Sequence, residues 1–314
     1  MNLTKIMARA ASGIAVLLLA TAISAVAFAQ DSRGDENYAV FVSQRNGAAE
    51  LYLIDLNTRQ VSQLTNTGRG HLTPAISSNR SIVFASREGS NYEIFSGTIG
   101  PALRTRRPTL VGINRLTVNT EDETAVSTTR DGVWVSFMSS SGIELMTAGG
   151  LERKVIVPKA ELATDFGPSI SPDGSRVAFV SNRSGEYEIW VYSTQNSEIR
   201  QVTRSGKVTG GLSWAADSKQ LVFNTTATAS EGSGIAMANV ENGSFRVLTD
   251  KGDFNGSLSV RSDRMLFTST RDGDAELYLL NVGSGSVERL TFNMGMDDGA
   301  VFVTEPVRLA RPTR

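Results

Sequence analysis

The stretch Pro168–Thr203, PSISPDGSRVAFVSNRSGEYEIWVYSTQNSEIRQVT, decides the fold of this chain. Its alternating residues and turn dipeptides predict four short strands joined by three turns. In the first turn, Ser171-Pro172-Asp173-Gly174, the proline presets φ and the glycine accepts a positive φ. The expected strands are Pro168–Ser171, Arg176–Ser181, Tyr187–Tyr192 and Ile199–Thr203.

The same pattern recurs as six units with three anchors: an aromatic in the second strand, an aliphatic in the third and an aliphatic-Thr pair in the fourth. Unit by unit, the anchors are Phe41, Leu51 and Leu64-Thr65; Phe84, Ile94 and Leu116-Thr117; Val135 or Phe137, Leu145 and Ile156; Phe179, Ile189 and Val202-Thr203; Phe223, Ile235 and Leu248-Thr249; Phe267, Leu277 and Leu290-Thr291. A period of about 42–53 residues with four strands per unit is typical of a β-propeller. The five anchor phenylalanines of the second strands are therefore predicted to lie in the core between blades.

The ring of blades is predicted to close through the C-terminus. The first unit lacks a first strand of its own, and the chain ends with an unmatched strand-like segment, Gly299–Val303. We expect this segment to join the first unit, because closure removes exposed sheet edges. The fold class is therefore all-β: a six-bladed β-propeller of four-stranded antiparallel blades, closed by a C-terminal strand.

Within the repeat, the segment SPDGSRVAFVSNRSGEYEIWVYS, Ser171–Ser193, resembles the repeat of TolB-like β-propellers. The resemblance covers nearly all of Tyr38–Val303 and is weaker in the third unit and in the fifth, where Gly234 replaces the usual Glu. TolB carries a separate α/β domain before its propeller, and almost nothing lies between the predicted leader and the first unit here. The resemblance thus implies a propeller without that domain, which argues against a direct TolB role in the Tol–Pal system. Because such propellers serve many roles, it implies fold more than function.

The N-terminus predicts an exported protein. Lys5 and Arg9 precede the apolar run Ile14–Phe28, and Ala27-Phe28-Ala29 forms a small-x-small cleavage site. These features predict a signal peptide over 1–29 and a single mature domain over 30–314, with no stable membrane span after cleavage. The chain has no cysteine and a formal net charge of −1, which favours the periplasm and gives no support for nucleic-acid binding.

Acidic residues that recur in every blade are interpreted as structural. A glutamate precedes the third-strand aliphatic in five units: Glu50, Glu93, Glu144, Glu188 and Glu276. We expect these glutamates to hydrogen-bond or to pair with arginines of the preceding turns, namely Arg45, Arg87, Arg183 and Arg271. Asp173, Asp217 and Asp263 are expected to bind nearby backbone N–H groups in turns.

Polar residues between consecutive blades are the candidate binding residues. The segments that join the blades are expected to lead into the central channel, and they place at its mouth His71, Asp122, Glu123, Asp165, Asn255, Asp297 and Asp298. A locally acidic mouth could hold Ca²⁺ through converging oxygens or attract a basic partner segment; it could equally be a solvated rim. No cofactor is expected apart from this possible Ca²⁺ in the channel, and whether a metal binds is left open.

A second candidate lies in the second unit, where 22 positions separate Ile94 from Leu116 against 13 in the units one, four, five and six. The insertion Pro101–Pro108 carries Arg104, Arg106 and Arg107 and predicts a basic loop on the rim. Such a loop could bind an acidic protein or anionic polymer, or be merely solvated.

Catalytic residues are not assigned. His71 is the only histidine, and the chain has no GxSxG, HExxH or CxxC motif. The sequence therefore favours a non-catalytic periplasmic module that binds an envelope protein or peptide through its channel face. The alternative is a small-ligand or carbohydrate-binding protein, or a hydrolase or lyase, with its site at the channel mouth.

Overall fold

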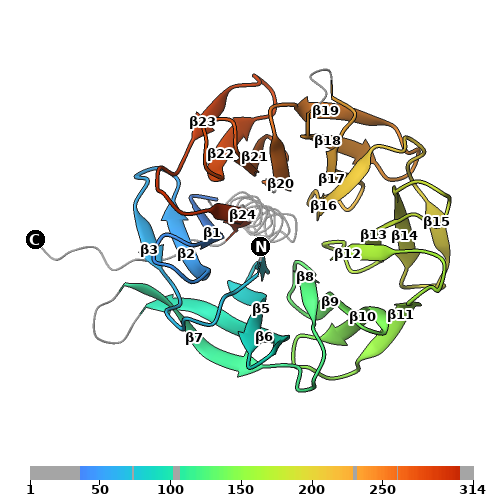
Figure 1. Ribbon diagram of the computed structural model, residues 1–314, viewed down its shortest axis with the longest axis horizontal. Coiled ribbons are helices and arrows are strands. Elements are labelled where there is room, and N and C mark those ends of the chain that lie inside the picture. The colour runs from blue at the N-terminus through green and yellow to red at the C-terminus, as the bar shows by residue number, and fades with distance from the viewer. Residues whose placement is uncertain (1–35, 73, 102–106, 229–231, 260, 305–314) are drawn as a thin grey trace, which may run out of the picture. The chain divides into compact units, whose positions relative to one another are not determined.

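The computed structural model describes residues 36–72, 74–101, 107–228, 232–259 and 261–304. These residues form six four-stranded antiparallel blades around a central axis (Figure 1). The predicted leader lies outside them. No helix in this part of the chain is long and apolar enough to span a membrane.

The strands of each blade follow one another outward from the axis. From inside to outside they are β24 (Asp297–Val303), β1 (Tyr38–Ser43), β2 (Glu50–Asp55) and β3 (Val61–Gln63) in blade 1; β4 (Ala75–Ile76), β5 (Ser81–Glu88), β6 (Asn91–Pro101) and β7 (Pro108–Arg115) in blade 2; β8 (Thr124–Thr128), β9 (Trp134–Ser139), β10 (Gly142–Thr147) and β11 (Lys154–Pro158) in blade 3. The remaining strands are β12 (Asp165–Ile170), β13 (Arg176–Ser181), β14 (Glu188–Ser193) and β15 (Ile199–Gln201) in blade 4; β16 (Val208–Trp214), β17 (Gln220–Thr225), β18 (Gly234–Asn239) and β19 (Phe245–Thr249) in blade 5; β20 (Asp253–Leu258), β21 (Arg264–Ser269), β22 (Glu276–Asn281) and β23 (Val287–Arg289) in blade 6.

The closing strand is confirmed. Strand β24 pairs antiparallel with β1 from Tyr38↔Val303 to Ser43↔Asp297. It starts two residues earlier than the predicted Gly299–Val303. Residues from the two ends of the described chain thus share one sheet, and blade 1 has its fourth strand.

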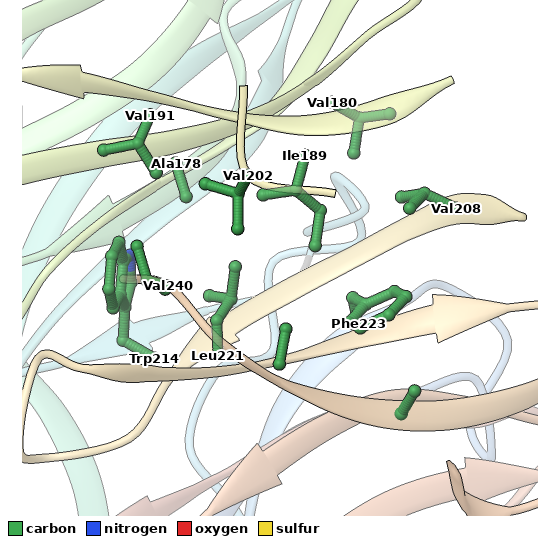
Figure 2. Close-up of a cluster of buried hydrophobic side chains, with 12 residues drawn as sticks. Ala178, Val180, Ile189, Val191, Val202, Val208, Trp214, Leu221, Phe223 and Val240 are labelled. Carbon is green, nitrogen blue, oxygen red and sulfur yellow. The ribbon is translucent and has the colours of Figure 1, made fainter. Parts of the chain in front are cut away.

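The core lies between the blades, as the anchors predicted. Phe41, Phe84, Phe179, Phe223 and Phe267 are all buried. Each of the six apolar clusters combines side chains from two neighbouring blades. Figure 2 shows the cluster in which Ala178 and Val180 of blade 4 meet Leu221 and Phe223 of blade 5. Because each blade packs both faces of its sheet against its neighbours, the stability of one blade depends on the blades beside it.

Strand pairing settles the uncertain register of blade 3. Val135 lies opposite Met146, as Phe179 lies opposite Trp190, so Val135 holds the anchor position. Phe137 lies opposite Glu144, where blade 4 has Ser181 opposite Glu188.

Two further sequence features have a local explanation. Asp173 and Asp217 accept hydrogen bonds from the backbone N–H groups of Ser175 and Lys219, as predicted, whereas Asp263 accepts one from the Ser259 hydroxyl. At Gly234, a Cβ atom would lie 2.1 Å from the carbonyl oxygen of Thr249. The β-turn aspartates therefore fix turns between strands, and blade 5 has no room for the glutamate of the other blades.

Candidate functional site

The central channel contains a cavity of about 340 Å³. The innermost strands of all six blades line it, and it extends to the turns that follow these strands, represented by Ser78, Arg130 and Pro172. Most of its wall is small, apolar or hydroxyl-bearing, as Ala75, Ser127, Ile170, Leu212 and Ser257 illustrate. This is the concave, mostly apolar type of surface on which ligands bind in many proteins.

Five of the six inner strands share a bend at one register position on the channel wall. Ala125, Gly167, Gly211, Asn255 and Gly299 all have φ between 52° and 63°. The pairing with the second strand shifts at each of these places, which marks a β-bulge. Glycine and asparagine tolerate this left-handed conformation, whereas alanine at position 125 adopts it at a cost of about 1 kcal/mol.

Four of the seven residues predicted at the channel mouth lie at the junctions between blades and not on the wall of the cavity. His71, Glu123, Asp165 and Asp297 stand at or just before the start of an innermost strand, and their side chains are buried. Asp253 occupies the same place in blade 6. We call these five residues the junction residues. They recur from blade to blade, which the sequence reasoning missed because the residue type changes between histidine, glutamate and aspartate.

Three junction aspartates bind arginines. The Nη2 atoms of Arg45, Arg183 and Arg271 lie 2.9, 2.9 and 2.8 Å from Asp297, Asp165 and Asp253, respectively. Each arginine Nε also donates to a serine two residues earlier: Ser43, Ser181 and Ser269. The guanidinium groups lie over aromatic rings of the second and third strands, which adds a cation–π contribution.

These contacts correct one expectation. Arg45, Arg183 and Arg271 pair with the junction aspartates and not with the repeated glutamates, and Arg87 lies over the ring of Tyr92. The arginine partners of Glu123, Asp165 and Asp297 offset the cost of burying these carboxylates. Ligand binding by the junction residues stays a prediction.

The repeated glutamates tie the third strand to the segment that leads to the next blade. The Glu50 carboxylate accepts hydrogen bonds from the Thr65 hydroxyl and from the backbone N–H groups of Thr67 and Gly68, each 2.6 Å long. Glu188 and Glu276 accept the equivalent bonds from Thr203 and Thr291. Glu93 accepts a bond from the backbone N–H of Asn119 and also binds Arg115, whereas Glu144 binds Arg153. The structural interpretation of this position is confirmed.

Glu123 shares Arg153 with Glu144. Nη1 of Arg153 lies 2.7 Å from Oε1 of Glu123, and its Nε lies 2.6 Å from Oε2 of Glu144. Burial raises the pKa of Glu123, against hydrogen bonds from Thr117, Asn119 and Arg153. Burial likewise raises the pKa of Asp297, which Arg45 and neighbouring hydroxyls counteract. The ionised forms of both carboxyl groups therefore depend on these hydrogen-bonding and charged partners, because burial removes the stabilisation that water would provide.

The remaining three residues predicted at the mouth, Asp122, Asn255 and Asp298, differ in their surroundings. Asp122 accepts a hydrogen bond from the backbone N–H of Tyr92 at 2.8 Å. Asn255 lines the cavity, and its side-chain amide donates to Asp298 at 2.9 Å. Asp298 also accepts from the hydroxyl of Thr268 at 2.7 Å, so it links blade 6 to the closing strand. Among the seven, Asn255 is the residue that lies on the wall of the cavity.

Comparison with known proteins agrees with this architecture. No protein-family model matches the chain. Over 170 residues the sequence is 30% identical to a "Protein TolB homolog" of Chlorobium luteolum, an alignment that covers 51% of this chain and 35% of that protein. The structure superimposes on TolB from Acinetobacter baumannii with a TM-score of 0.71 at 18% identity, over 85% of this chain and 66% of the other. The chain is a β-propeller similar to those of TolB proteins.

The likeness defines fold more than activity. The TolB-like propeller spans about a third of the length of the curated relative that it matches. It also superimposes on a chain of a nidogen/laminin complex with a TM-score of 0.63 at 12% identity, over 86% of this chain and 99% of the other. A fold shared so widely does not fix a function, which has to be argued from the site.

The basic insertion of the TolB-like propeller extends a long hairpin. Strands β6 and β7 pair as far as Pro101↔Pro108. Arg107 is exposed, whereas Arg104 and Arg106 lie outside the described residues. Binding of an acidic partner by these arginines stays a prediction.

The described residues of the TolB-like propeller include no group of three or more His, Asp or Glu side chains suited to a metal ion. The one carboxylate on the described wall of the cavity belongs to Glu36, which lies 3.5 Å from Arg264. Binding of Ca²⁺ in the channel stays a prediction that calorimetric titration with CaCl₂ would test.

His71 is a buried base in a hydrogen-bonded position. Its Nε2 lies 3.0 Å from Oε2 of Glu50 and 3.2 Å from the hydroxyl of Thr67, and its ring meets Phe84 edge to face. Burial lowers the pKa of His71, with a smaller contribution from Arg69, whereas Glu50 opposes the shift. Burial would raise the pKa of Glu50, but the bonds from Thr65, Gly68 and Thr67 outweigh it and lower that pKa.

His71 should make the TolB-like propeller less stable in mild acid. Because its pKa is lower in the folded than in the unfolded chain, the unfolded chain binds more protons once the pH falls below about 6.5. We expect the free energy of unfolding to fall by up to about 1.4 kcal/mol per pH unit from this group as the pH falls below about 6.5. Urea unfolding across this range, compared with His71→Gln, measures the difference. Parallel pH profiles of the two proteins would contradict the assignment.

Proposed function

We propose that this propeller is a non-catalytic module of the periplasm that binds a protein or peptide segment in its central channel. The observation that carries the proposal is the cavity of about 340 Å³, lined by the innermost strands of all six blades. Its volume is at the lower end of the range for ligand clefts, which suits a short segment and not a folded domain.

Two further observations support the proposal. The N-terminal sequence has the charged, apolar and small-x-small regions of a cleavable leader, which supports export. The curated relative is named as a TolB homolog, and we extend protein binding in the envelope to this chain by that likeness. The buried acidic residues of the described junctions are each paired with an arginine. We therefore assign them a structural role and not a catalytic one.

Blocking the channel should abolish binding. Ala75 and Ala216 lie on the cavity wall, each on a different blade, and neither side chain is fully buried. We expect Ala75→Trp and Ala216→Trp, made separately, to lose the proteins that the wild-type propeller retains from an envelope extract of the native cells. The indole fills much of the cavity in either case, so two unrelated positions should give the same result.

The control is Val287→Trp, because Val287 is exposed on the outermost strand of blade 6. Melting curves establish that all three variants fold. Retention of the same proteins by both blocked variants and the wild type would refute binding in the channel.

A further inference from the structure

The wall of the cavity carries a positive charge at the end of the channel that lies after the innermost strands. Arg130 and Glu36 are the charged residues among those lining the cavity within the described chain. The carboxylate of Glu36 is buried and lies 3.5 Å from Arg264. Arg130 is exposed, and its side chain has neither an ion pair nor a hydrogen bond among the described residues. Among the described residues that line the cavity, Arg130 is therefore the one charged residue without an ionic partner.

The backbone of Arg130 is held firmly although its side chain is free. Its N–H donates to the carbonyl of Pro172 at 3.0 Å, and its carbonyl accepts from the N–H of Ser78 at 2.8 Å. These bonds link the turns that follow the innermost strands of blades 2, 3 and 4. The position from which the guanidinium extends is thus fixed, which lowers the entropy lost when it binds a ligand.

Arg130 differs from the arginines at the blade junctions. Arg45, Arg183 and Arg271 are each engaged by a buried aspartate. Arg130 has no such partner among the described residues. It lies at the end of the cavity, next to a wall of uncharged residues such as Ile76, Ile170 and Leu258. A guanidinium binds a carboxylate through two parallel hydrogen bonds, and does so best beside apolar surface that excludes water.

We propose that Arg130 recognises a carboxylate of the bound segment, while apolar side chains next to that carboxylate fill the channel. The inference rests on the proposed binding of a segment in the channel and names its chemistry. The carboxylate is either the C-terminus of the segment or an aspartate or glutamate side chain. The partner is therefore an acidic, partly apolar segment.

A peptide library tests this inference. Random eight-residue peptides, synthesised once with a free C-terminal carboxylate and once as the C-terminal amide, are passed over the immobilised propeller, and the retained peptides are sequenced by mass spectrometry. We expect the wild type to retain carboxylate-bearing peptides with apolar neighbours, and Arg130→Gln to retain them roughly 10- to 100-fold less. Arg130→Glu should instead select Lys- or Arg-containing peptides.

The two libraries distinguish the source of the carboxylate. Selection confined to the free-acid library identifies the C-terminus, whereas selection of Asp- or Glu-containing peptides from the amide library identifies a side chain. Arg261→Gln is the matched control, because Arg261 is exposed on the same side, in the turn between β20 and β21, but does not line the cavity. This variant should behave as the wild type.

Several results would overturn the inference. They are equal retention by the wild type and Arg130→Gln, preference of the wild type for basic peptides, and retention of no peptide at all. If Ala75→Trp abolishes retention and Arg130→Gln does not, segment binding in the channel stands and carboxylate recognition falls. If Ala75→Trp and Ala216→Trp retain the same peptides as the wild type, the channel itself is not the site.

Discussion

Removal of Asp297–Arg314 should open the ring and lower the melting temperature by many degrees. Strand β24 supplies the innermost strand of blade 1 and buries Ala300 and Phe302 in the cluster between blades 6 and 1. Without it, β1 loses its inner hydrogen-bonding partner, and the apolar faces of both neighbouring blades meet water. The loss exceeds that of an ordinary point variant, because several buried side chains and a strand edge are affected together. Differential scanning calorimetry of the truncated and full-length proteins measures it.

A single substitution within β24 distinguishes the contribution of this strand from that of the residues that follow it, which the truncation also removes. Phe302→Ala should lower the free energy of unfolding by about 3–5 kcal/mol, because Phe302 is buried between blades. Phe292→Ala is the matched control, since Phe292 is exposed just before the same strand, and should change stability by less than about 0.5 kcal/mol. If the truncated chain melts like the full-length protein, closure by β24 does not stabilise the propeller.

Asp253→Ala should destabilise the propeller by about 3 kcal/mol. The Asp253 carboxylate is fully buried and accepts two 2.8 Å hydrogen bonds from Nη2 of Arg271. Removing one partner of a buried ion pair leaves the other charge uncompensated, which costs about 3–5 kcal/mol. We expect the lower end of this range, because 18% of the Arg271 side chain is still exposed to water. Urea unfolding at pH 7 measures the change.

Two comparisons make the result specific. Glu288→Gln breaks the exposed ion pair with Arg59 and should cost less than about 1 kcal/mol. The double variant Asp253→Leu, Arg271→Met should recover much of the loss, because it removes both buried charges and leaves apolar volume. A loss of similar size in Glu288→Gln and Asp253→Ala would show that burial does not determine the strength of these pairs.

The architecture was predictable from the sequence because it depends on local periodicity. Strand β13 covers Arg176–Ser181 as predicted, and the anchor phenylalanines are buried. The first strand of blade 4 begins at Asp165, three residues before the predicted Pro168, and the fourth ends at Gln201 and not at Thr203. Strand ends depend on pairing across the sheet, which single-sequence periodicity does not specify.

The candidate site was predicted less well, because burial and pairing decide what a polar residue can do. Asp165 and Asp297 look like free loop carboxylates in the sequence, yet Arg183 and Arg45, from the turn after the second strand of the same blade, pair with them. Arg130 carries no sequence signal, since its significance comes from a cavity that six separate segments enclose.

The number of blades, the four-stranded repeat and the closing strand were predictable from the chain alone, because they follow from the spacing of apolar residues and turns. Which charges are neutralised, and which one faces the channel, depends on contacts that form only in the folded protein. Whether a charge is neutralised depends on its neighbours in space, and closure of the ring brings distant parts of the chain together: Asp297 binds Arg45 across 252 positions of the chain.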